Sequence, residues 1–225
     1  MHTTLIMVGD SITEGVGASD PEKTSYVAIL GRLLGSDYTA LNFGRCGATV
    51  MDPKNGKIDS YLRLSHYERA KKAAADAAAH GDRVIVSIML GTNDADVIDY
   101  GFEAAGERYY EIYHDDFIEK TLSIVESFRA ICPEAVFLYC KSPRSYDNVK
   151  HKDFGNLESV WRYQQEIYER MLASGCKVTL LDVAAHTAPE ALGDGIADYF
   201  DDGLHPCDAG YEKMAAFFCD TIKKL

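Results

Sequence analysis

Five short apolar runs recur along the chain, each bounded by turn-forming residues. Most of these runs are continuously apolar rather than alternating, which is typical of strands buried on both faces of a sheet. The runs predict five strands, at Leu5–Val8, Thr39–Phe43, Arg83–Leu90, Ala135–Cys140 and Val178–Val183.

Segments with a helical spacing of apolar residues separate these runs. They predict helices at Ser25–Leu34, Ser65–His80, Tyr109–Ile131, Leu157–Ser174 and Asp208–Lys224. Strand and helix therefore alternate along the chain, which indicates an α/β fold whose parallel sheet is covered by helices on both faces. Because no linker or internal repeat interrupts the pattern, we expect a single domain over residues 1–225.

Polar, glycine-containing segments follow four of the predicted strands directly. They are Gly9–Ser11, Gly44–Gly47, Gly91–Asp94 and Lys141–Asp147. In parallel α/β folds, ligands bind beside the carboxyl ends of the strands. We therefore expect the functional site at this edge of the sheet.

Two longer polar stretches, 94–108 and 142–155, also follow predicted strands. Loops of this length in compact domains are often functional, so these two are candidates for shaping a substrate pocket. These stretches and the helices that follow them contain aromatic side chains that could line the pocket: Tyr100, Phe102, Tyr109, Tyr110, Tyr146, Phe154 and Trp161.

The overall charge narrows the choice of partners. The chain has 225 residues, of which 47% are hydrophobic, and its formal net charge is -12. An acidic surface without a cluster of lysine and arginine repels phosphate backbones and anionic lipid headgroups. We therefore expect a small-molecule substrate, and neither nucleic acid nor a membrane surface as a partner. The sequence does not indicate an oligomeric state.

Neither the cysteines nor the N-terminal segment points to secretion. The six cysteines are scattered, with no C-x-x-C pair, so we expect free thiols and no zinc site. No basic segment followed by a long apolar stretch is visible near Met1, and no apolar run is long enough to cross a bilayer. We expect a cytoplasmic protein, although a trimmed leader would leave the same sequence.

Ser11 and His205 are the candidate nucleophile and base. Ser11 follows the first predicted strand, where unpaired backbone N–H groups can bind developing negative charge; a helix N-cap is the alternative role. Asp202 precedes His205 by three residues and can turn its carboxylate onto the imidazole Nδ1, leaving Nε2 to accept a proton. The alternative is a polar turn between the last strand and the last helix. Asp201 is a second carboxylate that could take the partner role.

Two further segments could supply oxyanion donors. Asn93 lies just after the most apolar run, where its amide would be a fixed N–H donor, although asparagine also favours turns. In the segment Asn42 to Thr49, either Gly44 or Gly47 could bring a backbone N–H close to a ligand.

Taken together, these segments resemble the SGNH/GDSL hydrolase family. Four blocks match it in chain order: Gly9-Asp10-Ser11-Ile12-Thr13-Glu14-Gly15, Asn42 to Thr49, Gly91-Thr92-Asn93-Asp94, and Asp202 to Pro206. The four residue types for which the family is named correspond to Ser11, Gly47, Asn93 and His205. The family pattern selects Gly47 over Gly44 as the backbone donor, and Asp202 over Asp201 as the acid.

The resemblance implies a fold and a reaction. The fold is a three-layer α/β sandwich with a central five-stranded parallel sheet, of the flavodoxin-like type. The reaction is ester hydrolysis through an acyl-Ser11 intermediate without metal or cofactor, with an oxyanion hole from the Ser11 and Gly47 N–H groups and the Asn93 amide. Asp10 and Tyr146 are candidate substrate contacts. A short acyl group on a soluble carbohydrate is the favoured substrate; longer acyl chains, as in a lysophospholipase or thioesterase, are the alternative.

Other functions fit the sequence less well. An α/β-hydrolase needs a Gly-x-Ser-x-Gly elbow, which the chain lacks. The pair Gly15 and Gly17 has no third glycine that would complete a dinucleotide-binding fingerprint. A catalytically silent carbohydrate-binding domain would lack a triad member, and none is missing. Cys46 and Cys207 flank candidate positions, but no cysteine-hydrolase motif surrounds them.

Overall fold

The core of the molecule is a parallel five-stranded sheet. In the computed structural model, residues 1–54, 56, 59–96, 101–102, 108–144, 156–187, 199–200 and 202–225 are described. The strands run in the order β2-β1-β3-β4-β5, and all four pairings are parallel. This is the flavodoxin-like order, so the predicted fold class is confirmed. The strands are β1 (Thr3–Gly9), β2 (Tyr38–Gly44), β3 (Arg83–Met89), β4 (Val136–Lys141) and β5 (Lys177–Asp182).

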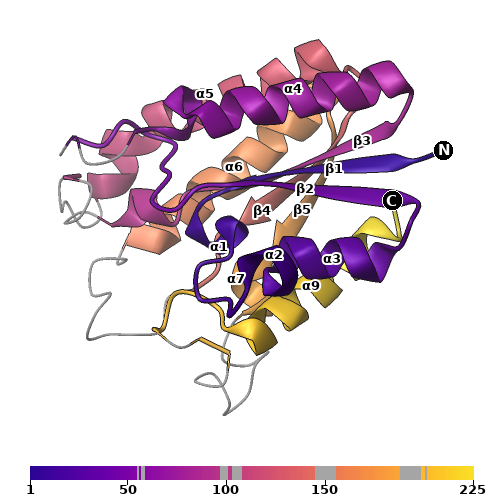
Figure 1. Cartoon of the computed structure of the whole chain (residues 1–225). Helices are drawn as coiled ribbons and strands as arrows, with labels where there is room; N and C mark the ends of the chain where they lie inside the picture. The colour runs from indigo at the N-terminus through magenta and orange to yellow at the C-terminus, as the bar shows by residue number, and fades with distance from the viewer. Residues whose placement is uncertain are drawn as a thin grey trace.

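Helices cover both faces of the sheet and give a three-layer sandwich (Figure 1). One face carries α4 (Ser65–His80), α5 (Arg108–Ile131) and α6 (Leu157–Ala173). The other carries α3 (Tyr26–Leu34) and α9 (Asp208–Ile222). The described part of the chain also contains short helical segments: α1 (Ser11–Glu14), α2 (Pro21–Thr24), η1 (Tyr61–Arg63), η2 (Asn93–Ala95) and α7 (Val183–His186).

The central strand β1 shows why its sequence is apolar at every position. Ile6 and Val8 pack into the hydrophobic cluster beneath α4, α5 and α6, whereas Leu5 and Met7 pack into the cluster beneath α3 and α9. All four side chains are fully buried. A strand buried on both faces needs apolar side chains on both, so the alternation expected of a half-exposed strand is absent.

The five strands and five long helices lie within two residues of their predicted bounds. The short helices were not predicted, because one turn is too short to show a helical period. Two of them, α1 and η2, are the next elements after β1 and β3, at the edge where the candidate residues lie. Among the described helices, none combines the length and the apolar character that crossing a membrane requires.

Candidate active site

Ser11 is held at the carboxyl end of the central strand by the turn from β1 into α1. It is the first residue of α1, and its side chain is 4% exposed. The Asp10 carboxylate caps this helix by accepting the N–H of Ile12 at 3.0 Å. The end of β2 packs so closely against α1 that a Cβ on Gly44 would lie 2.1 Å from the Glu14 nitrogen. Ser11 therefore has a fixed position beside the end of β2.

His205 and Asp202 complete a hydrogen-bonded chain with Ser11. His205 Nε2 lies 2.9 Å from Ser11 Oγ, and His205 Nδ1 lies 2.7 Å from Asp202 Oδ2. The other carboxylate oxygen of Asp202 accepts the backbone N–H groups of Leu204 at 2.9 Å and His205 at 2.6 Å. A carboxylate acceptor at Nδ1 keeps the proton there and leaves Nε2 free to accept one from the serine. The neighbouring Asp201 lies outside the described residues.

The loop after α1 holds the histidine segment in place, and sequence reasoning did not find this. The Tyr211 hydroxyl in α9 donates to the Val16 carbonyl at 2.6 Å, and the Ser19 N–H donates to Asp208 at 2.8 Å. Between these contacts, Gly17 has a φ of 92°. A Cβ there would lie 2.6 Å from the Pro206 oxygen and 3.2 Å from the His205 Cβ. Gly17, judged in the sequence only as part of a nucleotide-binding fragment, is instead a point where the loop after α1 touches the His205 segment.

The structure brings Asn93 beside the Gly47 loop. The Asn93 amide donates one N–H to the Ala48 carbonyl at 2.9 Å, and its second N–H has no partner among the described residues. The Gly44 N–H is already donated to the Asn42 side chain at 2.8 Å, whereas the buried Gly47 N–H has no partner among the described residues. Gly47 also has a φ of 77°. The geometry thus favours Gly47 as the backbone donor.

Three buried or half-buried carboxyls surround the site, and their environments differ. Burial raises the pKa of Asp10 to about 6 and the pKa of Asp94 to about 7, although backbone hydrogen bonds oppose the shift in both. Burial also acts to raise the pKa of Asp202, but the hydrogen bonds from His205 and Leu204 outweigh it and hold that pKa below its usual value. Asp202 is therefore the carboxyl suited to stay ionised beside the imidazole.

Of the two predicted substrate contacts, Asp10 and Tyr146, the structure describes only Asp10. Asp10 is 1% exposed, and one of its oxygens caps α1. Its burial favours a structural role over the predicted substrate contact. The second oxygen of Asp10 and the Thr92 hydroxyl are also buried, and the Thr92 side chain acts to lower the pKa of Asp10 against the effect of burial. Tyr146 lies outside the described residues.

Several of the candidate pocket aromatics belong to the core. Phe102 is 5% exposed and Tyr109 is fully buried. Tyr110 stacks on the ring of Tyr163 at 5.0 Å between centroids. Trp161 lies at the strand-end edge, where its Nε1 donates to the Ser142 carbonyl at 2.8 Å. Tyr100 and Phe154 lie outside the described residues.

The six cysteines, all within the described residues, are free thiols. In the same part of the chain, no group of three or more His, Cys, Asp or Glu side chains is arranged to hold a metal ion.

Comparison with known proteins finds that the chain is similar to several esterases. It is 27% identical over 223 residues to an acetylxylan esterase of Xylanibacter ruminicola, covering 96% of this chain and 42% of that protein. The chain thus spans less than half the length of this curated relative. A native aryl esterase structure of M. smegmatis has a TM-score of 0.64 at 18% identity and covers 100% of both chains.

A third similar protein is a family two carbohydrate esterase of Clostridium thermocellum, solved in complex with cellohexaose. Its TM-score is 0.68 at 20% identity, covering 99% of this chain and 64% of the other. These two structural likenesses concern the fold. The family model of the GDSL-like lipase/acylhydrolase family matches residues 7–213, a range that contains Ser11, Gly47, Asn93 and the Asp202–His205 pair. The chain belongs to the GDSL-like lipase/acylhydrolase family.

Proposed function

We propose that this chain is a serine esterase that transfers an acyl group from an ester to water. The observation that carries the proposal is the hydrogen-bonded chain from Ser11 Oγ through His205 to Asp202, with distances of 2.9 and 2.7 Å. An alcohol, an imidazole and an ionised carboxylate in this order are the components of a nucleophilic triad.

In the proposed reaction, Ser11 Oγ attacks the ester carbonyl while His205 Nε2 takes its proton. Asp202 stabilises the imidazolium that forms. The negative charge on the carbonyl oxygen is bound by the N–H groups of Ser11 and Gly47 and by the second amide N–H of Asn93. The tetrahedral intermediate collapses to an acyl-Ser11 ester, and the alcohol leaves with the proton from His205. Water then repeats the sequence and releases the acid and free Ser11.

A short acyl group on a carbohydrate is the substrate class we favour. The acetylxylan esterase similarity extends over nearly the whole of this chain and supports this choice. The acidic charge of -12 disfavours anionic lipid surfaces. A chain-length series of nitrophenyl esters, assayed beside acetylated sugars, tests it. We expect kcat/KM to fall as the acyl chain lengthens; a rise with chain length would support a lipid ester instead.

Ser11→Ala tests the mechanism. We expect hydrolysis of p-nitrophenyl acetate to fall to the rate without enzyme, with unchanged circular dichroism and melting temperature, because the variant removes only the attacking oxygen. A folded Ser11→Ala protein with full activity would overturn the proposal.

A further inference from the structure

Asp94 is a fully buried carboxyl that the proposed reaction does not use. It is 0% exposed and follows Asn93 in η2. Its Oδ1 accepts the N–H of Val50 at 3.0 Å and the N–H of Met51 at 2.8 Å, and its Oδ2 also accepts the Val50 N–H at 3.0 Å. Burying a carboxyl costs folding free energy unless hydrogen bonds offset the cost. Here the hydrogen bonds join η2, which follows β3, to the loop that follows β2.

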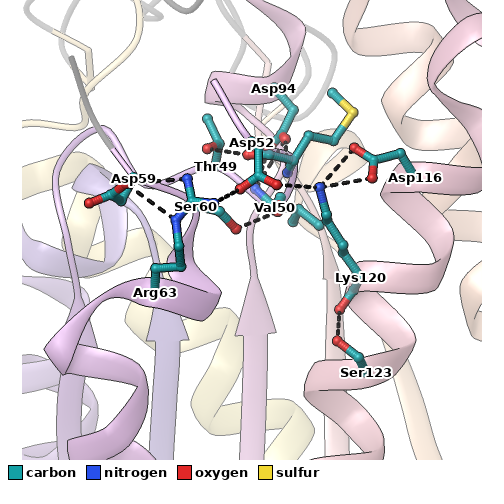
Figure 2. Close-up of polar contacts among 11 residues, drawn as sticks. Thr49, Val50, Asp52, Asp59, Ser60, Arg63, Asp94, Asp116, Lys120 and Ser123 are labelled. Carbon is teal, nitrogen blue, oxygen red and sulfur yellow. Dashed lines mark hydrogen bonds and ion pairs between the residues drawn. The ribbon is translucent and has the colours of Figure 1, made fainter. Parts of the chain in front are cut away.

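That loop carries Gly47, and its carbonyl groups are also held. The Ala48 carbonyl accepts the Asn93 amide at 2.9 Å, and the Thr49 carbonyl accepts the Tyr61 N–H at 2.8 Å. The Val50 carbonyl accepts the Ser60 hydroxyl, and the Met51 carbonyl accepts the Thr49 hydroxyl, both at 2.7 Å. Residues 48–51 are at most 1% exposed. Figure 2 shows Asp94 and Ser60 contacting this segment from different sides.

The next residue, Asp52, is held from outside by charged side chains. Its carboxylate lies 2.5 Å from Arg63 and 2.9 Å from Lys120, which also pairs with Asp116 at 2.8 Å (Figure 2). The Asp52 side chain is 47% exposed. Exposed ion pairs contribute little to holding a backbone, because water competes for both partners. The buried hydrogen bonds of Asp94 therefore restrain the loop more strongly than the outer ion pairs do.

We propose that Asp94 is a positioning residue that sets the spacing between the two oxyanion donors Gly47 and Asn93. Its carboxylate accepts the N–H groups of Val50 and Met51 and thereby restrains the Gly47 loop. Because Asp94 follows Asn93 in the η2 turn, it also restrains the position of Asn93. The inference rests on the proposed function, because an oxyanion hole matters only if a tetrahedral intermediate forms. Oxyanion donors stabilise the transition state more than the bound substrate. A change in their spacing should therefore lower kcat rather than raise KM.

Asp94→Asn tests this, with Asp52→Asn as the matched control in the same loop. Asparagine keeps one acceptor but places an NH₂ group against the Val50 N–H, so the loop must shift. We expect kcat on p-nitrophenyl acetate to fall about 10- to 100-fold, the effect of a small misplacement, with KM changed less than about twofold. Asp52→Asn should keep the wild-type kcat. A wild-type kcat in folded Asp94→Asn, or an equal loss in Asp52→Asn, would overturn the proposal.

A double-mutant cycle separates positioning from general destabilisation. If Asp94 acts through the oxyanion donors, Asp94→Asn should cost less in an Asn93→Ala background than alone. Costs that simply multiply would contradict the proposal. If Asp94→Asn does not fold, Tyr109→Phe replaces it, because the Tyr109 hydroxyl donates to the Asp94 backbone carbonyl. A lower kcat at constant KM is then expected, and an unchanged kcat would refute the inference.

Failure of this inference is distinguishable from failure of the proposed function. An active Ser11→Ala protein would refute both. An inactive Ser11→Ala protein with a fully active Asp94→Asn protein would refute the positioning role alone.

Discussion

Ser11 Oγ and His205 Nε2 lie 2.9 Å apart although 194 positions separate the two residues in the chain. Ser11 follows the central strand β1, and His205 precedes α9, which packs against α3 on one face of the sheet. The contacts of Tyr211 with Val16 and of Asp208 with Ser19 join the two segments. The proximity is thus a product of helix packing as well as of strand order.

Replacing Asp202 should disable the base while leaving the fold intact. Asp202→Asn removes the carboxylate that holds the proton on His205 Nδ1, and the imidazole can then present the wrong tautomer to Ser11. We expect kcat to fall by about 10⁴, as in other triads of this kind. Steady-state kinetics on p-nitrophenyl acetate measure it. A loss smaller than about tenfold would show that His205 does not depend on this carboxylate.

Removing the Asn93 amide should affect the transition state more than substrate binding. We expect Asn93→Ala to lower kcat by about 10²–10³, roughly 2.7–4 kcal/mol, with little change in KM. The variant also removes the hydrogen bond from Asn93 to the Ala48 carbonyl, which should lower its stability. The assay is therefore run well below the melting temperature measured for the variant. A change confined to KM would place Asn93 in substrate binding instead.

Gly17 should be required for the position of His205. In Gly17→Ala, the new methyl group would approach the Pro206 oxygen and the His205 Cβ, so the His205 loop must move. We expect about a 10- to 100-fold lower kcat. Gly35→Ala is the matched control, because Gly35 also has a positive φ, of 82°, but no atom within 4 Å of the added Cβ. Both variants strain the backbone, at a cost of about 1–3 kcal/mol, but only Gly17→Ala should lose activity. Equal kcat values in the two variants would contradict the prediction that the Gly17→Ala methyl group displaces the His205 loop.

The buried carboxyls predict how stability depends on pH. In the fold, burial raises the pKa of Asp10 from 3.8 to about 6 and that of Asp94 from 3.8 to about 7. At pH values between the ordinary pKa and the raised pKa of each group, the folded state binds more protons than the unfolded state. The stability that these groups contribute is therefore lost as pH rises from about 4 to about 7. Each group adds at most about 1.4 kcal/mol per pH unit to this slope.

Denaturant unfolding across this pH range measures the slope. Asp10→Asn should make it shallower, because a side chain that does not titrate replaces one that does. Asp220→Asn, at an exposed position of α9, is the control and should leave the slope unchanged. A steeper slope in Asp10→Asn than in the wild type would refute this assignment.

The sequence by itself determined the order and type of the main elements. Runs such as Leu5–Val8 are apolar at every position because both faces of their strand are buried, and this pattern is local. The four family blocks likewise identified Ser11, Gly47, Asn93 and His205 as candidates, because those residue types stand at strand ends and loops in a recognisable order.

Only the tertiary structure decided which contacts these residues make. The choice between Gly44 and Gly47 depends on which N–H is already donated, and this follows from the packing of Asn42 against α1. Gly17 lies close to His205, although the two residues are far apart in the chain. Likewise, Asp94 accepts hydrogen bonds from Val50 and Met51, which belong to a distant segment. Local patterns carry no information on such pairs, because the partners are chosen by how helices and loops pack on the sheet.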